Sequence, residues 1–386
     1  MIMRLFDLSG SSITVAEALT RGKNNFDLFR LIAALLVIYG HSFAIAPEPN
    51  SQDFLFKLTG YYSAAIAVKF FFFLSGILVT DSLLKRRSVI QFLIARFFRI
   101  WPALGFVLIL SAFVIGPLVT SLDVGSYFSN SNVYSFIKHQ LFMESWGTQG
   151  LGYYYLPGVF TEGTYKDNVN ASLWSLVAEV YAYLFLAAAF LLGLTQRKLA
   201  VALFALIILD SVLPSRIIFT LLPQGNEDFS YLPFCFASGA FLALYKDQIR
   251  IDIGVPLACL LLFYLLHGTP SERYFFYLTI FTGIFYFATR SWVINNLYPP
   301  MDVSYGAFLW GFPIQQTLAY SFPSVNGSSH YLIAMCIAIV MGGAVGLSLK
   351  KGLSNWANEY LNALQQLQII NRKFFNNCRI FNWRMK

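Results

Sequence analysis

The sequence predicts an all-α protein, a polytopic bundle of transmembrane helices. Two observations carry this prediction. Of the 386 residues, 57% are hydrophobic and only 12% are charged, whereas a soluble domain carries about twice that charged fraction. The apolar residues also fall in about ten runs of near-helical length, and a helix that crosses a bilayer needs roughly 20 mostly apolar residues.

Ten membrane spans are predicted, at residues 27–46, 62–84, 97–121, 172–194, 198–213, 231–245, 253–268, 274–290, 303–322 and 331–349. Three of these, near 198–213, 231–245 and 253–268, are among those shorter than the usual length of about 17–25 residues and are the least well defined. A further stretch, 127–146, is predicted to be an interfacial or re-entrant piece of a long loop.

These spans divide the chain into three parts. Residues 1–25 form a cytoplasmic segment, 26–349 form the membrane domain, and 350–386 form a basic amphipathic tail that rests on the cytoplasmic face of the membrane. Within the membrane domain, residues 122–171 form a long loop that faces outward.

The distribution of basic residues orients the bundle. With the N-terminus in the cytoplasm, 21 of the 27 lysines and arginines lie at or near one side, five lie on the other, and Lys69 lies inside the second span. The excess of lysine and arginine on the cytoplasmic side of membrane proteins then predicts that both termini are cytoplasmic. The net charge of +8 is thus explained by topology, and no nucleic-acid partner is expected.

The cysteines and the start of the chain exclude other classes of protein. The four cysteines have no paired spacing, so neither a disulfide framework nor a zinc site is predicted; they are Cys235, Cys259, Cys336 and Cys378. The first apolar run is too long for a cleavable signal peptide and lacks a cleavage site of small residues. We expect no metal.

The first predicted span carries one arginine and one histidine in an apolar run, FDLFRLIAALLVIYGHSFAIA. Arg30 and His41 are eleven residues apart, so at about 100° per residue they share one helix face, roughly 16 Å apart along the axis. Polar groups are costly in lipid, so we expect this face to meet protein or a water-filled cavity. The alternative is an interfacial arginine with an unrelated histidine.

Two more arginines begin the third span. Arg96 and Arg99 are three residues apart and therefore neighbours on one face, at the cytoplasmic mouth of the bundle. Paired guanidinium groups suit a phosphorylated ligand, because each makes bidentate bonds to phosphate oxygens. By itself this spacing is a weak signal, since interfacial arginines are common.

Three polar residues from different spans are predicted at a similar depth near the outer side, namely His41, Lys69 and Glu179. Together they predict a polar chamber in the bundle. A histidine oriented by a carboxylate is the minimum apparatus for a general base near neutral pH. The alternative for Lys69 is that its long side chain extends to the outer interface.

The motifs FDLFRLIAALLVIYGH, VKFFFFLSGILV, RFFRIWPAL and SLWSLVAEVYAY follow one another along the chain, and the weaker DVSYGAFLWGFPI comes near the end. Together they resemble bacterial acyltransferase family 3, integral-membrane O-acyltransferases that modify surface and secreted saccharides. The resemblance covers the chain from about residue 24 to 349.

The resemblance implies roles for five residues. His41 matches the essential histidine of the first span, and Arg30 matches its partner arginine. Arg96 and Arg99 match the pair thought to hold the acyl-CoA donor. Glu179 matches the acidic residue that follows the LWSL motif.

Two positions depart from the family pattern. Many members have aspartate or another residue where this chain has Lys69, which puts a role for Lys69 in doubt. Many members also have a histidine at the position of Gly311, within the run WGFP, so no second histidine is expected there.

We therefore expect an O-acyltransferase of the cell inner membrane. It would move an acyl group, with acetyl-CoA as the expected cytoplasmic donor, to a saccharide hydroxyl at the outer side. Exopolysaccharide, lipopolysaccharide or a glycolipid would be the acceptor. The residues do not choose among acceptors or acyl-chain lengths, and they leave open a covalent acyl-enzyme and a homo-oligomer.

Two other classes of function fit parts of the sequence. A transporter or flippase of a lipid-linked saccharide would also place charged residues between spans, but the arginine pair lies on one side only and no internal repeat is seen. A scaffold or receptor without enzymatic activity leaves the shared face of Arg30 and His41 unexplained.

The predicted topology can be tested by labelling single cysteines in a cysteine-free background with a membrane-impermeant reagent. Ser126→Cys, in the outward loop, should be labelled in intact spheroplasts, whereas Ser88→Cys and Ser354→Cys should react only after the membrane is opened. Labelling of Ser354→Cys in intact spheroplasts would require an odd number of crossings and overturn the ten-span topology.

Overall fold

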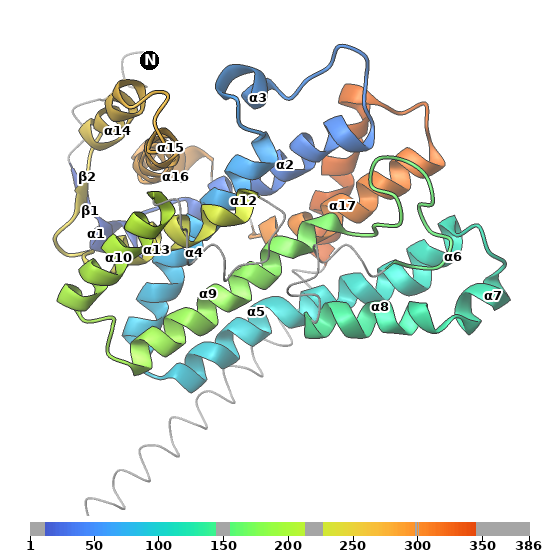
Figure 1. Cartoon of the computed structure of the whole chain (residues 1–386), viewed down its shortest axis with the longest axis horizontal. Coiled ribbons are helices and arrows are strands. Elements are labelled where there is room, and N and C mark those ends of the chain that lie inside the picture. The colour runs from blue at the N-terminus through green and yellow to red at the C-terminus, as the bar shows by residue number, and fades with distance from the viewer. Residues whose placement is uncertain (1–11, 144–154, 213–226, 298, 300, 345–386) are drawn as a thin grey trace, which may run out of the picture.

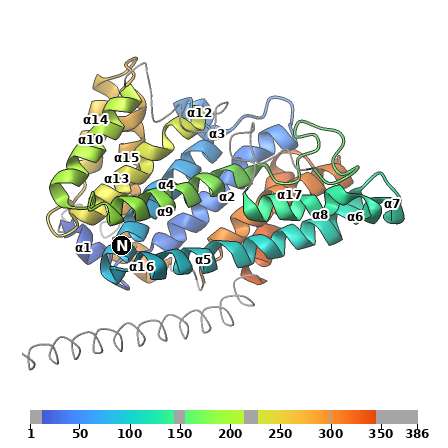
Figure 2. The same cartoon turned by 60° about the horizontal axis from the view of Figure 1, so that its bottom comes forward.

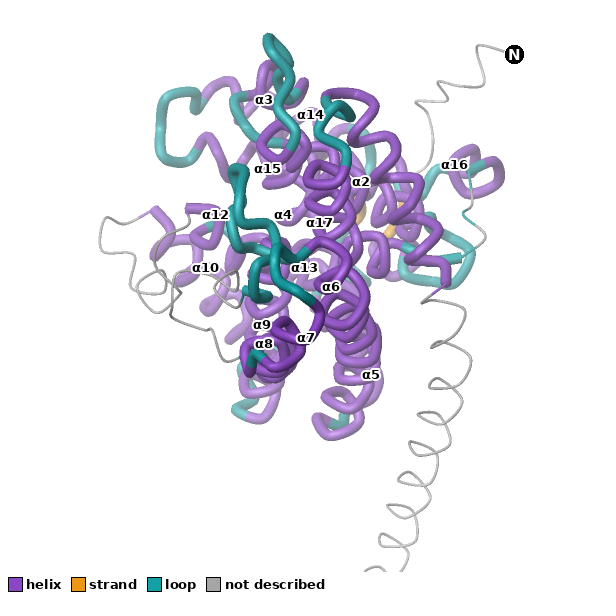
Figure 3. Tube along the Cα trace, turned by 90° about the vertical axis from the view of Figure 1, so that its right-hand side faces the viewer, coloured by secondary structure: helices purple, strands orange, loops and turns teal. Residues whose placement is uncertain are grey.

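The computed structural model describes residues 12–143, 155–212, 227–297, 299 and 301–344. These residues form a bundle of packed helices (Figure 1). Strand is confined to one sheet of two short strands (Figure 3). The prediction of an all-α fold is thereby confirmed for the described residues. The predicted tail, 350–386, and residues 1–11 of the N-terminal segment lie outside them.

The helices and strands follow one another along the chain. In order they are β1 (Ile13–Thr14), α1 (Val15–Ala18), α2 (Phe26–Ile45), α3 (Phe54–Thr59), α4 (Ser63–Arg86), α5 (Val89–Leu110), the π-helical turn η2 (Ser111–Ile115), α6 (Gly116–Val119), α7 (Val124–Ser129), α8 (Ser131–Phe142), the 3₁₀ turn η3 (Ala171–Leu173), α9 (Trp174–Leu191), α10 (Arg197–Val212), α12 (Glu227–Ser230), α13 (Leu232–Leu244), β2 (Arg250–Ile251), α14 (Gly254–Leu265), α15 (Glu272–Ala288), α16 (Ser291–Asn296), α17 (Ser304–Ser321) and an unlabelled helix, Gly327–Ala344.

A helix occupies the position of each of the ten predicted spans. Five helical runs are long and apolar enough to cross a membrane by length and composition, and they are Phe26–Ile45, Ser63–Arg86, Val89–Val119, Ala171–Leu191 and Gly327–Ala344. The other five helices, α10, α13, α14, α15 and α17, contain 12 to 18 residues. The protein is therefore a membrane protein, while the count of ten crossings and their orientation stay predictions.

The third predicted span is longer than expected. It runs without a break through α5, η2 and α6, from Val89 to Val119, and Ser88 caps its start by accepting a hydrogen bond from the Gln91 N–H. The stretch predicted to be interfacial or re-entrant contains α8, which packs along α5 (Figure 1). There the Trp101 indole donates to the Leu141 carbonyl at 3.0 Å.

Helix α4 is the central element of the bundle. It packs against α2, α5, α9, α13 and α15, and 72% of its apolar window is buried. Its closest neighbour is α13, which it meets through two glycines. A Cβ on Gly76 would overlap the Phe236 carbonyl oxygen, and a Cβ on Gly239 would overlap that of Phe73. Small residues thus let the two backbones approach, as is common between membrane helices.

Helices α2 and α17 also pack side by side (Figure 1). Gly311 of α17 faces Ile38 of α2, and a Cβ at this glycine would collide with that side chain. The position at which many family members carry histidine therefore serves close helix packing in this chain.

The N-terminal segment contacts two other segments that ten alternating crossings would place on the same side of the membrane. Strand β1 pairs antiparallel with β2, with Ile13 opposite Ile251. Asn25, which caps α2, donates from its side chain to the Val293 carbonyl at 3.0 Å. The N-terminal segment thereby contacts the chain both between α13 and α14 and after α15, and the predicted topology assigns all of these to the cytoplasm (Figure 2).

The glycine contact between α4 and α13 yields a stability prediction. Gly239→Ala should lower the free energy of unfolding by about 1–3 kcal/mol, because the methyl group overlaps backbone that cannot move aside. Gly283→Ala, on α15, is the matched control, since its methyl would meet only the Pro256 Cβ at 3.9 Å. Thermal unfolding of the purified variants in detergent measures both. Equal midpoints for Gly239→Ala and wild type would contradict the close packing.

Candidate functional site

A cavity of about 120 Å³ lies in the bundle between α2, α4, α5, α9 and α17. Its polar lining contains all three arginines singled out from the sequence together with one carboxylate. These polar residues are Arg30, Ser75, Arg96, Arg99, Ser175, Glu179, Tyr183 and Tyr305. Phe71 and Phe308, whose ring centroids are 6.1 Å apart, are among the apolar residues that line it. We call this space the arginine cavity.

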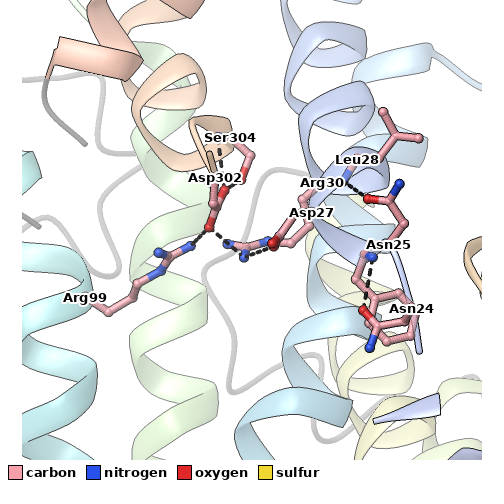
Figure 4. Close-up of polar contacts among 9 residues, drawn as sticks. Asn24, Asn25, Asp27, Leu28, Arg30, Arg99, Asp302 and Ser304 are labelled. Atoms are coloured by element: carbon pink, nitrogen blue, oxygen red, sulfur yellow. Dashed lines mark hydrogen bonds and ion pairs between the residues drawn. The ribbon is translucent and has the colours of Figure 1, made fainter. Parts of the chain in front are cut away.

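Two of the arginines meet at a single carboxylate oxygen (Figure 4). Arg30 Nη1 and Arg99 Nη2 each lie 3.0 Å from Asp302 Oδ2. The other oxygen, Oδ1, accepts hydrogen bonds from the Ser304 hydroxyl at 2.6 Å and from the Ser304 backbone N–H at 3.2 Å. Asp302 therefore ties α2 and α5 to the start of α17.

Asp302 is ionised in this position. Its side chain is 9% exposed, and burial alone raises the pKa of a carboxyl group. The guanidinium groups of Arg30 and Arg99, together with the hydrogen bond from Ser304, outweigh burial and hold the pKa of Asp302 well below its ordinary value. Asp27, 3.7 Å from Arg30, adds a second and more exposed negative charge.

Arg96 differs from the other two arginines. Its guanidinium lies over the rings of Phe92 and Tyr183, at 6.0 and 5.8 Å from their centroids. Within the described residues its buried Nε–H has no hydrogen-bond partner. The cavity thus contains one guanidinium that is held by aromatic rings and is not paired with a described carboxylate.

Glu179 lines the same cavity. One of its oxygens accepts hydrogen bonds from the Tyr183 hydroxyl, one turn further along α9, and from the Ser75 hydroxyl of α4 at 3.2 Å. Arg96 and Arg99, predicted to share one face of their helix, both line this cavity. The structure therefore brings Arg30, Arg96, Arg99 and Glu179 together.

His41 lies outside the described lining of the arginine cavity, near the other end of α2. Its ring packs edge-on against Phe312, at 5.3 Å between centroids, and lies 6.4 Å from the ring of Tyr165. In the described part of the chain its buried Nδ1 has no hydrogen-bond partner. His41 is therefore an imidazole with an unused nitrogen, set in an aromatic surrounding.

A buried hydrogen-bond network fixes the helix turn next to His41. Gln315 Nε2 donates to the Ile38 carbonyl at 2.8 Å and to the Ser42 hydroxyl at 2.7 Å. The fully buried ring of His330 lies 3.4 Å from Ser42 Oγ and 3.1 Å from the Gln315 carbonyl. These contacts join α2, α17 and the helix Gly327–Ala344 at the level of the candidate base.

The structure does not bring His41, Lys69 and Glu179 together in the one chamber that the sequence predicted. Glu179 lies in the arginine cavity, whereas His41 contacts α17 and the loop before η3. Lys69 is fully buried on another side of α4, with its ammonium 5.7 Å from the Tyr277 ring, and it does not reach the interface. The prediction that Glu179 orients His41 is therefore corrected, because counting residues gives the depth of a side chain but not the direction in which it points.

Three residues around the cavity were not predicted from the sequence. Asp302 begins the motif DVSYGAFLWGFPI, and Tyr183 ends the motif SLWSLVAEVYAY, four residues after Glu179. Ser75 lies in the LSG of the second span. The sequence did contain one signal for Asp302. It is a carboxylate at the mouth of a predicted span, on the side where the arginines lie.

Comparison with known proteins identifies the family. The family described as "Acyltransferase domain", of the acyltransferase 3 type, matches residues 23–347. The chain belongs to this family, and the resemblance stated from the sequence motifs is confirmed. Fold and family together define a membrane-embedded acyltransferase with a helical bundle.

Two relatives show where the similarity lies. The O-acetyl transferase of Shigella phage Sf6 is 26% identical over 304 residues, which are 76% of this chain and 85% of the relative. Nodulation protein 10 of Rhizobium leguminosarum bv. viciae is 39% identical over 84 residues, 21% of this chain and 22% of that protein. No solved structure matches the chain significantly.

Proposed function

We propose that this protein is an O-acetyltransferase of the inner membrane, which takes an acetyl group from acetyl-CoA on the cytoplasmic side and delivers it to a saccharide hydroxyl on the outer side. One observation carries the proposal. Three arginines line one cavity near the start of α2, and an imidazole with an unused nitrogen lies further along the same helix.

The donor site is the arginine cavity. Guanidinium groups are the side chains best suited to phosphate, because their planar N–H donors match its oxygens in pairs. Arg96 brings an N–H without a described partner, while Arg30 and Arg99 use one N–H contact each on Asp302 and keep further donors. The phosphates of acetyl-CoA would be held there, at the end of the bundle predicted to face the cytoplasm.

Helix α17 borders both the arginine cavity and His41. Tyr305 and Phe308 line the cavity, and Phe312, one turn further on, packs against His41. Arg30 and His41 are roughly 16 Å apart along α2. A donor as elongated as CoA could place its phosphates at the arginines and its thioester at His41.

In the proposed transfer step His41 acts as the general base. A ring nitrogen of His41 takes the proton of a saccharide hydroxyl as the hydroxyl oxygen attacks the thioester carbonyl. The carbon–sulfur bond then breaks, CoA leaves as thiolate, and the imidazolium returns the proton to the sulfur. General-base catalysis of this kind contributes about 10²–10⁴ to a rate.

In this mechanism Glu179 acts in the arginine cavity and does not orient His41. Its carboxylate accepts from Ser75 and Tyr183 and offsets part of the positive charge around the donor site. We retain it as a candidate catalytic residue whose partners are those two hydroxyls.

The choices of acetyl group and saccharide have separate support. Acetyl transfer to oxygen follows the name of the Sf6 relative, which the chain covers over most of its length. A saccharide acceptor follows from the family resemblance, as does the use of acyl-CoA. The apolar helices and the family support a location in a membrane, and the inner membrane is part of the proposal.

The first test concerns His41. Membranes that contain the wild-type protein should transfer label from [¹⁴C]acetyl-CoA to saccharide, and His41→Ala should lower the turnover by at least about a hundredfold. CoA binding should be retained, because His41 lies outside the described lining of the donor cavity.

His267→Ala is the matched control, since the side chain of His267 is 78% exposed and its loss should leave turnover unchanged. Near-normal transfer by well-expressed His41→Ala protein would remove this residue from the mechanism. Movement of saccharide across the membrane without transfer of label would favour a transporter.

The second test separates donor binding from anchoring at the interface. Arg96→Lys keeps the charge but loses the paired N–H geometry, so the half-saturating acetyl-CoA concentration should rise about tenfold to a hundredfold. Arg86→Lys, at the exposed end of α4, is the control and should behave like wild type. An unchanged half-saturating concentration in Arg96→Lys would place the donor elsewhere.

A further inference from the structure

Asp302 stands in an unusual position for a donor site that must hold phosphate. Its Oδ2 lies 3.0 Å from the guanidinium groups of both Arg30 and Arg99. The carboxylate is nearly buried and is held from its other side by Ser304 (Figure 4). An anion that binds these two arginines therefore meets a negative charge already in place.

The formal charges around the cavity show what the negative charge of Asp302 contributes. Three guanidinium groups line the cavity, and Asp302, Glu179 and the more exposed Asp27 bring three carboxylates near them, so the formal charges cancel. Without Asp302 there would be a formal excess of one positive charge. Because the side chain of Asp302 is only 9% exposed, its charge is screened less than that of a residue at the surface.

We propose that Asp302 is a positioning residue that sets the affinity of the arginine cavity for the phosphates of the donor. It holds Arg30 and Arg99 in a fixed arrangement, so that CoA binds in one orientation. It also offsets part of their charge, so that CoA can leave after each transfer. This inference rests on the proposed acyl-CoA donor and adds to it a residue that limits how tightly the donor is held.

The geometry explains why a carboxylate is suited to this task. Each guanidinium has five N–H donors and uses only part of them on Asp302, so both arginines stay able to bind phosphate. The Ser304 hydroxyl and backbone N–H keep the carboxylate itself from turning into the cavity. A neutral residue at position 302 would remove the carboxylate that both arginines contact.

The test is CoA binding to purified full-length protein in nanodiscs, measured with radiolabelled CoA. Asp302→Asn, which is nearly the same size, should bind CoA about tenfold more tightly and release it correspondingly more slowly. A residue with a structural role alone would have the opposite effect, because disordered arginines would bind CoA less well. Asp302→Glu restores the charge and should return the affinity to within about threefold of wild type.

Asp27→Asn is the matched control. It removes a carboxylate that is near Arg30 but more exposed and does not contact Arg99, so CoA affinity should change less than about twofold. If Asp302→Asn leaves too much buried charge to fold, the pair Arg30→Gln and Arg30→Gln/Asp302→Asn replaces it. The double variant keeps the wild-type net charge and should bind CoA more tightly than Arg30→Gln alone.

The outcomes are distinct. Equal or weaker CoA binding by folded Asp302→Asn, or by the double variant relative to Arg30→Gln, overturns the role of Asp302 and leaves the acyl-CoA proposal intact. A wild-type protein that binds no CoA overturns both proposals. Tighter binding that Asp302→Glu reverses supports the proposal.

Discussion

The ionic contact of Arg30 and Arg99 with one oxygen of Asp302 is the interaction on which the site depends. It joins the helix that carries His41 to the helix that carries Arg96 and to the start of α17. Removal of one partner from a buried ion pair typically costs about 3–5 kcal/mol, because the remaining charge is left in a poorly solvated place. The same contact that orders three helices therefore also brings positive charge into an apolar bundle.

Around this contact, the bundle separates two kinds of chemistry. The arginine cavity is rich in charge and hydroxyl groups, whereas His41 lies among aromatic rings, with a buried hydrogen-bond network on the next residue, Ser42. Helix α17 borders both regions through Phe308 and Phe312. A reaction that starts from a phosphorylated donor and ends on a neutral hydroxyl suits such a division, because anion binding and proton transfer require different surroundings.

Much of this architecture could be predicted from the sequence. The apolar runs located helices at all ten expected positions, and spacing within one span placed Arg96 and Arg99 along the same cavity. Contacts between helices could not be predicted in this way, because an apolar sequence gives the depth of a residue without its direction. Glu179 therefore turned out to face Ser75 and Tyr183, and Asp302 was missed although its motif had been recognised. The pairing of β1 with β2 lacked any signal, since each strand has only two residues.

The separation of Arg30 and Asp302 along the chain has a consequence for biogenesis. The two residues are 272 positions apart, so at the usual pace of translation the first helix exists for tens of seconds before its counter-ion is made. A charged side chain at the centre of a membrane helix costs about 2.5–3.5 kcal/mol during insertion, and Arg30, the fifth residue of α2, lies nearer the helix end. Asp27, three residues from Arg30, is the nearby carboxylate available in that interval. Arg30 therefore has a neighbouring carboxylate from the start, and its contact with Asp302 can form only after the start of α17 has been made, so the site is completed late in synthesis.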